Sequence, residues 1–165
     1  VALGFSGEIL VGQLIGAGQF KLASRMVRKS LYLGWAISFG IAILAALSAP
    51  YTLSLFTQDK NIIETATVLL WLTVLLEPGR TCNVIVINAL RATGDARFPV
   101  MVGAVSMLLV MAGGSWLFGN YFGLGLVGVW IAYALDEWLR GLIMLWRWFS
   151  RAWVPHARVS VRRIV

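Results

Sequence analysis

The sequence predicts an all-α protein, a polytopic bundle of about five transmembrane helices that forms a single membrane domain. Hydrophobic residues make up 59% of the chain and charged residues 13%, whereas soluble domains average about 45–50% apolar and about 25% charged. Two stretches, residues 30–58 and residues 98–135, contain no charged residue. A membrane-spanning helix needs roughly 20 apolar residues. The second stretch is too long for one span, so it must contain a turn.

Charges, prolines and glycines divide the chain into five apolar segments. The first is interpreted as a truncated helix, because the chain begins with Val1 in an already apolar stretch, and we expect a longer protein to precede it. Pro50 closes the second segment. The third exceeds the thickness of a bilayer core, and Pro78 with Gly79 predicts a bend inside it. The segments are residues 1–17, 31–49, 62–90, 98–118 and 124–148.

The connections between these segments predict an orientation. The first and third connections and the C-terminal tail are basic, whereas the second has only Lys60 and the fourth has no basic residue. This alternation is expected when successive connections lie on opposite sides of a membrane, and the basic side is assigned to the cytoplasm. The tail, residues 149–165, is therefore predicted to be cytoplasmic. The basic residues are Lys21, Arg25, Arg28 and Lys29, then Arg91 and Arg97, then Arg147, Arg151, Arg158, Arg162 and Arg163.

The composition also excludes several function classes. The net charge is +7, but the positive residues lie beside apolar segments, where they are typical of membrane topology rather than of nucleic-acid binding. Cys82 and His156 are the single cysteine and histidine, so no set of His and Cys metal ligands is present. No phosphate-binding loop or catalytic triad motif occurs. We therefore expect no enzyme activity, no cofactor and no nucleic-acid partner.

Ionisable residues inside apolar segments are the candidate functional residues, because they are costly in a membrane and usually face a cavity or a partner. Glu77 and Arg80 flank Pro78 at i, i+3 spacing, so they lie on one helix face. They are either a charged gate or ion site at a discontinuous helix, or an internally neutralised pair that fixes the bend.

A second group consists of Asp136, Glu137 and Arg140. Either acid can reach the arginine along the helix, at i, i+4 or i, i+3 spacing. One arginine neutralises one acid, so the remaining carboxylate can exchange a proton or hold Na⁺. The alternative is that this segment lies at the edge of the bundle and its charges reach the inner headgroups. Further candidates for polar groups in a cavity are Glu8, which has no evident partner in the chain, Asn83 and Asn88.

Three motifs resemble those of the multidrug and toxic compound extrusion (MATE) family and occur in the same order. They are VGQLIGAG at residues 11–18 with Ala23 and Arg25 after it, ALRATGD at residues 89–95 followed by Phe98 and Pro99, and GLVGVWIA at residues 125–132. Together they extend over nearly the whole chain. The resemblance implies that the five segments are the last five of twelve helices and form part of the C-terminal lobe.

The resemblance further implies a two-lobed exporter of the bacterial inner membrane with a cytoplasmic C-terminus. Such an exporter takes up Na⁺ or H⁺ and exports cationic or amphipathic small molecules, and its N-terminal part would be the partner of this chain. Some members have a cation-binding acid eleven positions before the loop arginine. Here that position is Arg80, and Glu77 is the nearest acid. The alternatives are a flippase for lipid-linked oligosaccharides, which would need a basic cleft, and a structural membrane subunit without transport.

Overall fold

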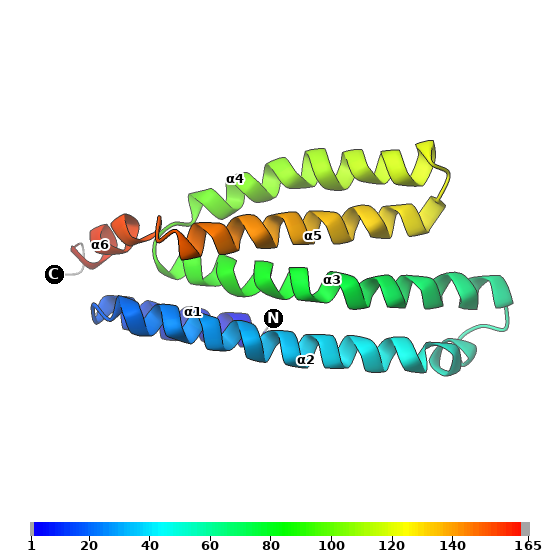
Figure 1. The fold of residues 1–165 in the computed structure, drawn as a ribbon, viewed down its shortest axis with the longest axis horizontal. Coiled ribbons are helices and arrows are strands. Elements are labelled where there is room, and N and C mark those ends of the chain that lie inside the picture. The colour runs from blue at the N-terminus through cyan, green and yellow to red at the C-terminus, as the bar shows by residue number, and fades with distance from the viewer. Residues whose placement is uncertain (1, 163–165) are drawn as a thin grey trace.

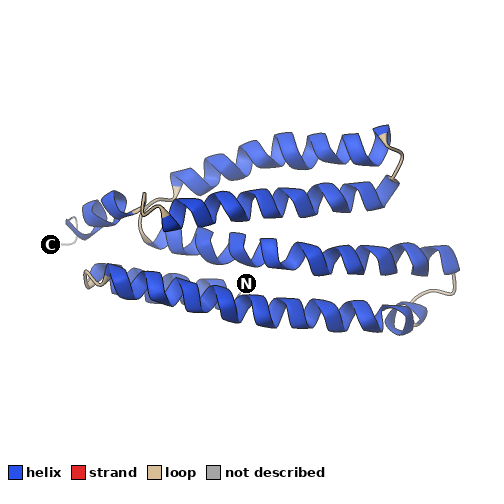
Figure 2. Ribbon diagram, viewed as in Figure 1, coloured by secondary structure: helices blue, strands red, loops and turns tan. Residues whose placement is uncertain are grey.

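Helices account for nearly all of the computed structural model, which describes the backbone of residues 2–162 and the side chains of residues 7–159 (Figure 2). No strand occurs in that part of the chain, so the predicted all-α class is confirmed. The elements are α1 (Ala2–Gly16), α2 (Phe20–Ser54), α3 (Lys60–Ala92), α4 (Arg97–Ser106), η1 (Met107–Ala112), η2 (Ser115–Tyr121), α5 (Gly125–Phe149) and α6 (Val154–Arg162).

Three of the described helical stretches are long and apolar enough to cross a membrane: Phe20–Ser54, Lys60–Ala92 and Arg97–Tyr121. The apolar part of α1, Gly7–Gly16, is shorter than a full span. Helix α5 has 25 residues, which is enough to cross, but it contains Asp136, Glu137 and Arg140. These three charged residues lower its mean hydropathy.

The helices extend beyond the apolar segments that the sequence indicates. Helix α2 begins at Phe20 rather than near residue 31, because its basic first turns are good helix formers but are not apolar. It also continues past Pro50 to Ser54, whereas the sequence places its end at the proline. Helix α3 is assigned as one continuous helix with Pro78 inside it. Residues 163–165 of the predicted basic tail lie outside the described residues, and α6 occupies the preceding part of the tail.

The stretch from Arg97 to Tyr121 changes its helical form along its length. It begins as the α-helix α4 and then continues as two π-helical pieces, η1 and η2. The bond from the amide of Phe122 to Leu117 O, 3.0 Å long, spans the five residues that are characteristic of a π-turn. Hydropathy patterns carry no signal for such wide turns, and the sequence did not predict them.

The long helices lie side by side and alternate in direction (Figure 1). Helix α3 packs between α2 and α5, the α4–η1–η2 stretch packs on α5, and α1 packs on α2 and α3. The α1–α2 turn, the α3–α4 turn and α6 gather at one end of the bundle, while the α2–α3 and η2–α5 turns lie at the other. The connections that the sequence marks as basic therefore share one end, which we call the basic end.

The main hydrophobic core lies toward the basic end. It joins Val11 of α1, Leu31 of α2, Val86 of α3 and Met144 of α5, all of which are buried. Trp148 and Trp153 stack with their ring centroids 4.6 Å apart, so α6 is held against the bundle. Large apolar side chains also cover the outer faces, as expected for helices that face lipid; examples are Ile41, Leu44, Leu108 and Leu109.

Candidate functional site

The site is built where the backbones of α3 and α5 come close together at two glycines. A Cβ atom on Gly141 would lie 2.8 Å from the carbonyl oxygen of Gly79, and one on Gly79 would lie 3.0 Å from Cγ of Trp138. Small residues allow such contact between membrane helices. One turn from these glycines, Asn83 on α3 and Glu137 on α5 therefore face each other within hydrogen-bonding distance.

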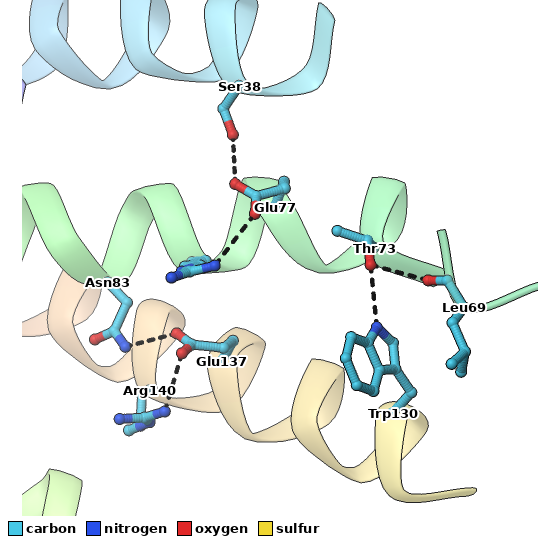
Figure 3. Close-up of polar contacts among 9 residues, drawn as sticks. Ser38, Leu69, Thr73, Glu77, Asn83, Trp130, Glu137 and Arg140 are labelled. Carbon is cyan, nitrogen blue, oxygen red and sulfur yellow. Dashed lines mark hydrogen bonds and ion pairs between the residues drawn. The ribbon is translucent and has the colours of Figure 1, made fainter. Parts of the chain in front are cut away.

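A buried cluster of polar and charged side chains joins α3, α4 and α5 at this point, and Figure 3 shows the part formed by Asn83, Glu137 and Arg140. Asn83 Nδ2 donates to Glu137 Oε2 over 2.8 Å, and Arg140 Nη2 donates to Glu137 Oε1 over 3.2 Å. The same nitrogen lies 2.5 Å from Asp136 Oδ2, in an ion pair without hydrogen-bond geometry. Ser106, the last residue of α4, donates its hydroxyl to Asp136 Oδ1. We call Asn83, Ser106, Asp136, Glu137 and Arg140 the buried charge cluster.

The cluster contains two acids and one base, and it is deeply buried. Asp136 is 0% exposed and Glu137 is 6% exposed, so neither carboxylate reaches the edge of the bundle. One guanidinium nitrogen serves both acids, which leaves a surplus negative charge when both are ionised. Asn83 Oδ1 and Arg140 Nε are also buried and have no hydrogen-bond partner among the described residues. The sequence predicted the group on α5 and named Asn83, but its link to Ser106 was missed.

Glu77 and Arg80 form a separate, more open group on the side of α3 that faces α2. Ser38 Oγ of α2 donates to Glu77 Oε2 over 2.7 Å, and Arg80 Nη1 lies 3.5 Å from Glu77 Oε1. The side chains of Arg80 and Glu77 are 48% and 24% exposed. The i, i+3 pair that the sequence indicated is therefore present, and among the described residues no hydrogen bond or ion pair joins it to the buried charge cluster.

Two tryptophans bind the backbone carbonyls around Pro78. Trp138 Nε1 of α5 donates to Leu75 O over 2.8 Å, and Trp35 Nε1 of α2 donates to Pro78 O over 3.1 Å. A proline inside a helix disturbs the hydrogen bonds of the preceding turn. Leu75 O and Pro78 O thus each accept a hydrogen bond from a tryptophan of a neighbouring helix.

A further tryptophan of α5, Trp130, donates to Thr73 Oγ1 of α3 over 3.0 Å (Figure 3).

The other sequence candidates lie apart from both groups. Glu8 on α1 is half-buried and makes no ion pair or hydrogen bond within the described part of the chain. Asn88 is buried on α3 and likewise has no hydrogen-bond partner among the described residues. Ser38 and Ser106 could not be found from the sequence, because isolated serines in apolar helices do not indicate which helix they face.

The ALRATGD motif closes α3 and creates an ion pair at the basic end. Gly94 has φ +85°, a conformation that favours glycine, and the amide of Asp95 donates back to Leu90 O over 3.1 Å. This turn buries Asp95, whose Oδ2 accepts a 2.9 Å hydrogen bond from Nε of Arg147 on α5. The guanidinium carbon of Arg147 also lies 4.4 Å from the ring centroid of Phe98. The motif therefore ties the α3–α4 turn to α5.

Comparisons with known proteins identify similar sequences. The family model MatE matches residues 1–116. The chain is 44% identical to "Uncharacterized transporter YisQ" of Bacillus subtilis over 147 residues, which are 89% of this chain and 32% of that protein. It is 26% identical to "Probable multidrug resistance protein NorM" of Thermotoga maritima, over 99% of this chain and 36% of that protein. The chain thus spans about a third of the length of these relatives. No solved structure gave a match.

Proposed function

Because the chain belongs to the MatE family, we propose that it is part of an ion-coupled secondary transporter that exports cationic or amphipathic small molecules. In this proposal the remaining two thirds of the transporter come from a segment equivalent to the rest of the relatives. The inward movement of Na⁺ or H⁺ supplies the free energy. The printed name of the Thermotoga relative, a probable multidrug resistance protein, supports the substrate class.

The observation that carries the coupling role is the buried charge cluster. Two carboxylates share one guanidinium nitrogen there, so binding of one cation would neutralise the surplus charge. Charges of this kind inside a membrane typically mark ion or proton pathways. The cluster also connects α3, α4 and α5, so a change in its charge would act on the packing of three helices.

The contact between Asn83 and Glu137 suits a proton as the coupling ion. With Glu137 ionised, Asn83 Nδ2 donates to the carboxylate. With Glu137 protonated, rotation of the amide by half a turn would present Oδ1, which now has no partner, to the carboxyl O–H. Asparagine can therefore bond both protonation states of Glu137 without moving its backbone.

Substitution of the acids tests this proposal. In cells that produce the transporter containing these residues, Asp136→Asn and Glu137→Gln are expected to reduce gradient-dependent dye efflux to near background. Glu77→Gln is expected to have a smaller effect, because Glu77 is partly exposed. Glu64→Gln is the matched control, since it removes the same charge from an exposed position on α3.

The amount of each variant in the membrane and its melting temperature must be measured alongside efflux. If Asp136→Asn and Glu137→Gln both leave ion-coupled efflux intact, the buried charge cluster is not the coupling site. That result would favour a structural role for the cluster.

We also propose that the basic end faces the cytoplasm of the bacterial inner membrane. The single cysteine of this chain, Cys82, is buried, so labelling is read on peptides of this chain, where an introduced surface cysteine is the exposed thiol. Ser150→Cys at the basic end should resist a membrane-impermeant maleimide on intact cells, and Asn120→Cys near the opposite turn should react. Both positions are exposed in the bundle. Reaction of Ser150→Cys combined with protection of Asn120→Cys would invert the orientation.

A further inference from the structure

A groove on the outer face of the bundle lies between α4–η1 and α5. Its volume is about 440 Å³. Val102, Val105 and Leu109 form one wall, and Leu139 and Ile143 of α5 form the other. Ser106 is the one polar residue among the described residues of the lining, and its hydroxyl already donates to Asp136. An occupant of this groove therefore needs no polar atoms along its length.

The groove continues to the basic end. A shallower pocket of about 370 Å³ adjoins it through Met101, which lines both, and includes Arg97 at the start of α4. Arg97 is exposed and makes no ion pair or hydrogen bond within the described chain. The neighbouring Arg147, in contrast, is neutralised by Asp95. Arg97 therefore places a free positive charge at the polar end of an apolar groove.

The length and direction of the groove match one leaflet of a bilayer. From Phe98 to Leu109 the helix rises by about 16 Å at 1.5 Å per residue. One leaflet contributes about 15 Å to the hydrocarbon core. The residues that line the groove follow one another along α4 and η1 from Phe98 onward, and α4 begins at the basic end of the bundle (Figure 1). A fully extended hydrocarbon chain fits these features better than a folded or polar ligand.

We propose that this groove binds an acyl chain of an anionic phospholipid, whose phosphate pairs with Arg97. Exposed apolar helices are surrounded by lipid in general, but this site differs in having a defined cavity and a charge at the headgroup level. Its inner end contacts Ser106, so the bound chain lies against the buried charge cluster. The proposal does not depend on ion coupling, since lipid binding can be measured without transport.

Photo-crosslinking with lipids tests this site. The probes are phosphatidylglycerol and phosphatidylcholine, each with a photoactivatable group near the end of an acyl chain, added to the intact transporter in bilayer nanodiscs. Peptides that contain residues 98–110 and 139–143 should be labelled more strongly by phosphatidylglycerol. The exposed face of α2, around Ile41 and Leu44, should be labelled equally by both lipids.

Two matched pairs of variants localise the acyl chain and the headgroup. Leu109→Trp should lower groove labelling to the level of the α2 face, while Leu108→Trp should leave it unchanged. Leu108 and Leu109 are 72% and 71% exposed, but only Leu109 lines the groove. Arg97→Gln should reduce the preference for phosphatidylglycerol by about fivefold, the effect of one arginine near an anionic surface. Arg91→Gln is the control for Arg97→Gln, because it removes the same charge from an exposed position at the same end of the bundle.

Three results would overturn the proposal. Equal labelling of the groove and the α2 face would indicate ordinary surrounding lipid. Equal effects of Leu108→Trp and Leu109→Trp would exclude a defined cavity. Labelling of the α2 face by both lipids with no labelling of the groove would show that the intact transporter covers it.

Discussion

Gly128→Ala is expected to lower the free energy of unfolding by about 1–3 kcal/mol or more, the usual cost of overpacking a tightly packed interface. A Cβ atom at this position would lie 2.5 Å from both C and O of Phe118 and 2.7 Å from the amide nitrogen of Gly119. All three are backbone atoms, so no side-chain rotation can relieve the overlap. Helix α5 and η2 must move apart, and the contact between them is lost.

Gly113→Ala is the matched control for this prediction. Gly113 lies between η1 and η2, where a Cβ atom would have no neighbour within 4 Å. Alanine is about 1 kcal/mol more favourable than glycine inside a helix, so Gly113→Ala should be neutral or slightly stabilising. Thermal unfolding in a mild detergent measures both. Equal melting temperatures for the two variants would mean that η2 and α5 are not in close contact in the membrane.

Features of the fold that depend on local composition could be predicted from the sequence. The charge-free stretches indicated membrane helices, and the basic residues correctly grouped two turns and the C-terminal tail at one end of the bundle. Hydropathy identifies only the apolar part of a helix, so the basic first turns of α2 were missed. The π-helical pieces η1 and η2 were also missed, because no residue pattern in the stretch marks a wide turn.

In the candidate site, contacts within one helix could be predicted from the sequence, whereas contacts between helices could not. The pairs of Glu77 with Arg80 and of Arg140 with the acids of α5 follow from helical spacing alone. The partners Ser38 and Ser106 lie far away in the sequence, and finding them requires the rotation and height of each helix. The glycines at 79 and 141 allow a close approach of α3 and α5. This contact becomes recognisable only when the helices are placed together.

Arg140→Met is expected to be the most damaging single substitution at the buried charge cluster. It leaves Asp136 and Glu137 buried without their shared cation, and breaking a buried ion pair from one side typically costs about 3–5 kcal/mol. Arg80→Met is the matched control, because Arg80 also pairs with an acid one turn away but is half exposed. Exposed pairs contribute about 0–1 kcal/mol. Denaturant unfolding of the reconstituted protein should separate the two variants clearly.

The cause of the loss at Arg140 can be identified with two further measurements. If unpaired carboxylates are responsible, lowering the pH should restore part of the stability of Arg140→Met, because a neutral carboxyl group is less costly to bury. The double variant Asp136→Asn with Arg140→Met should likewise lose less than the sum of the two single variants. A loss in Arg140→Met no larger than that in Arg80→Met would show that water reaches the carboxylates. The cluster would then lie in an open cavity of the transporter rather than in a dry contact between α3, α4 and α5.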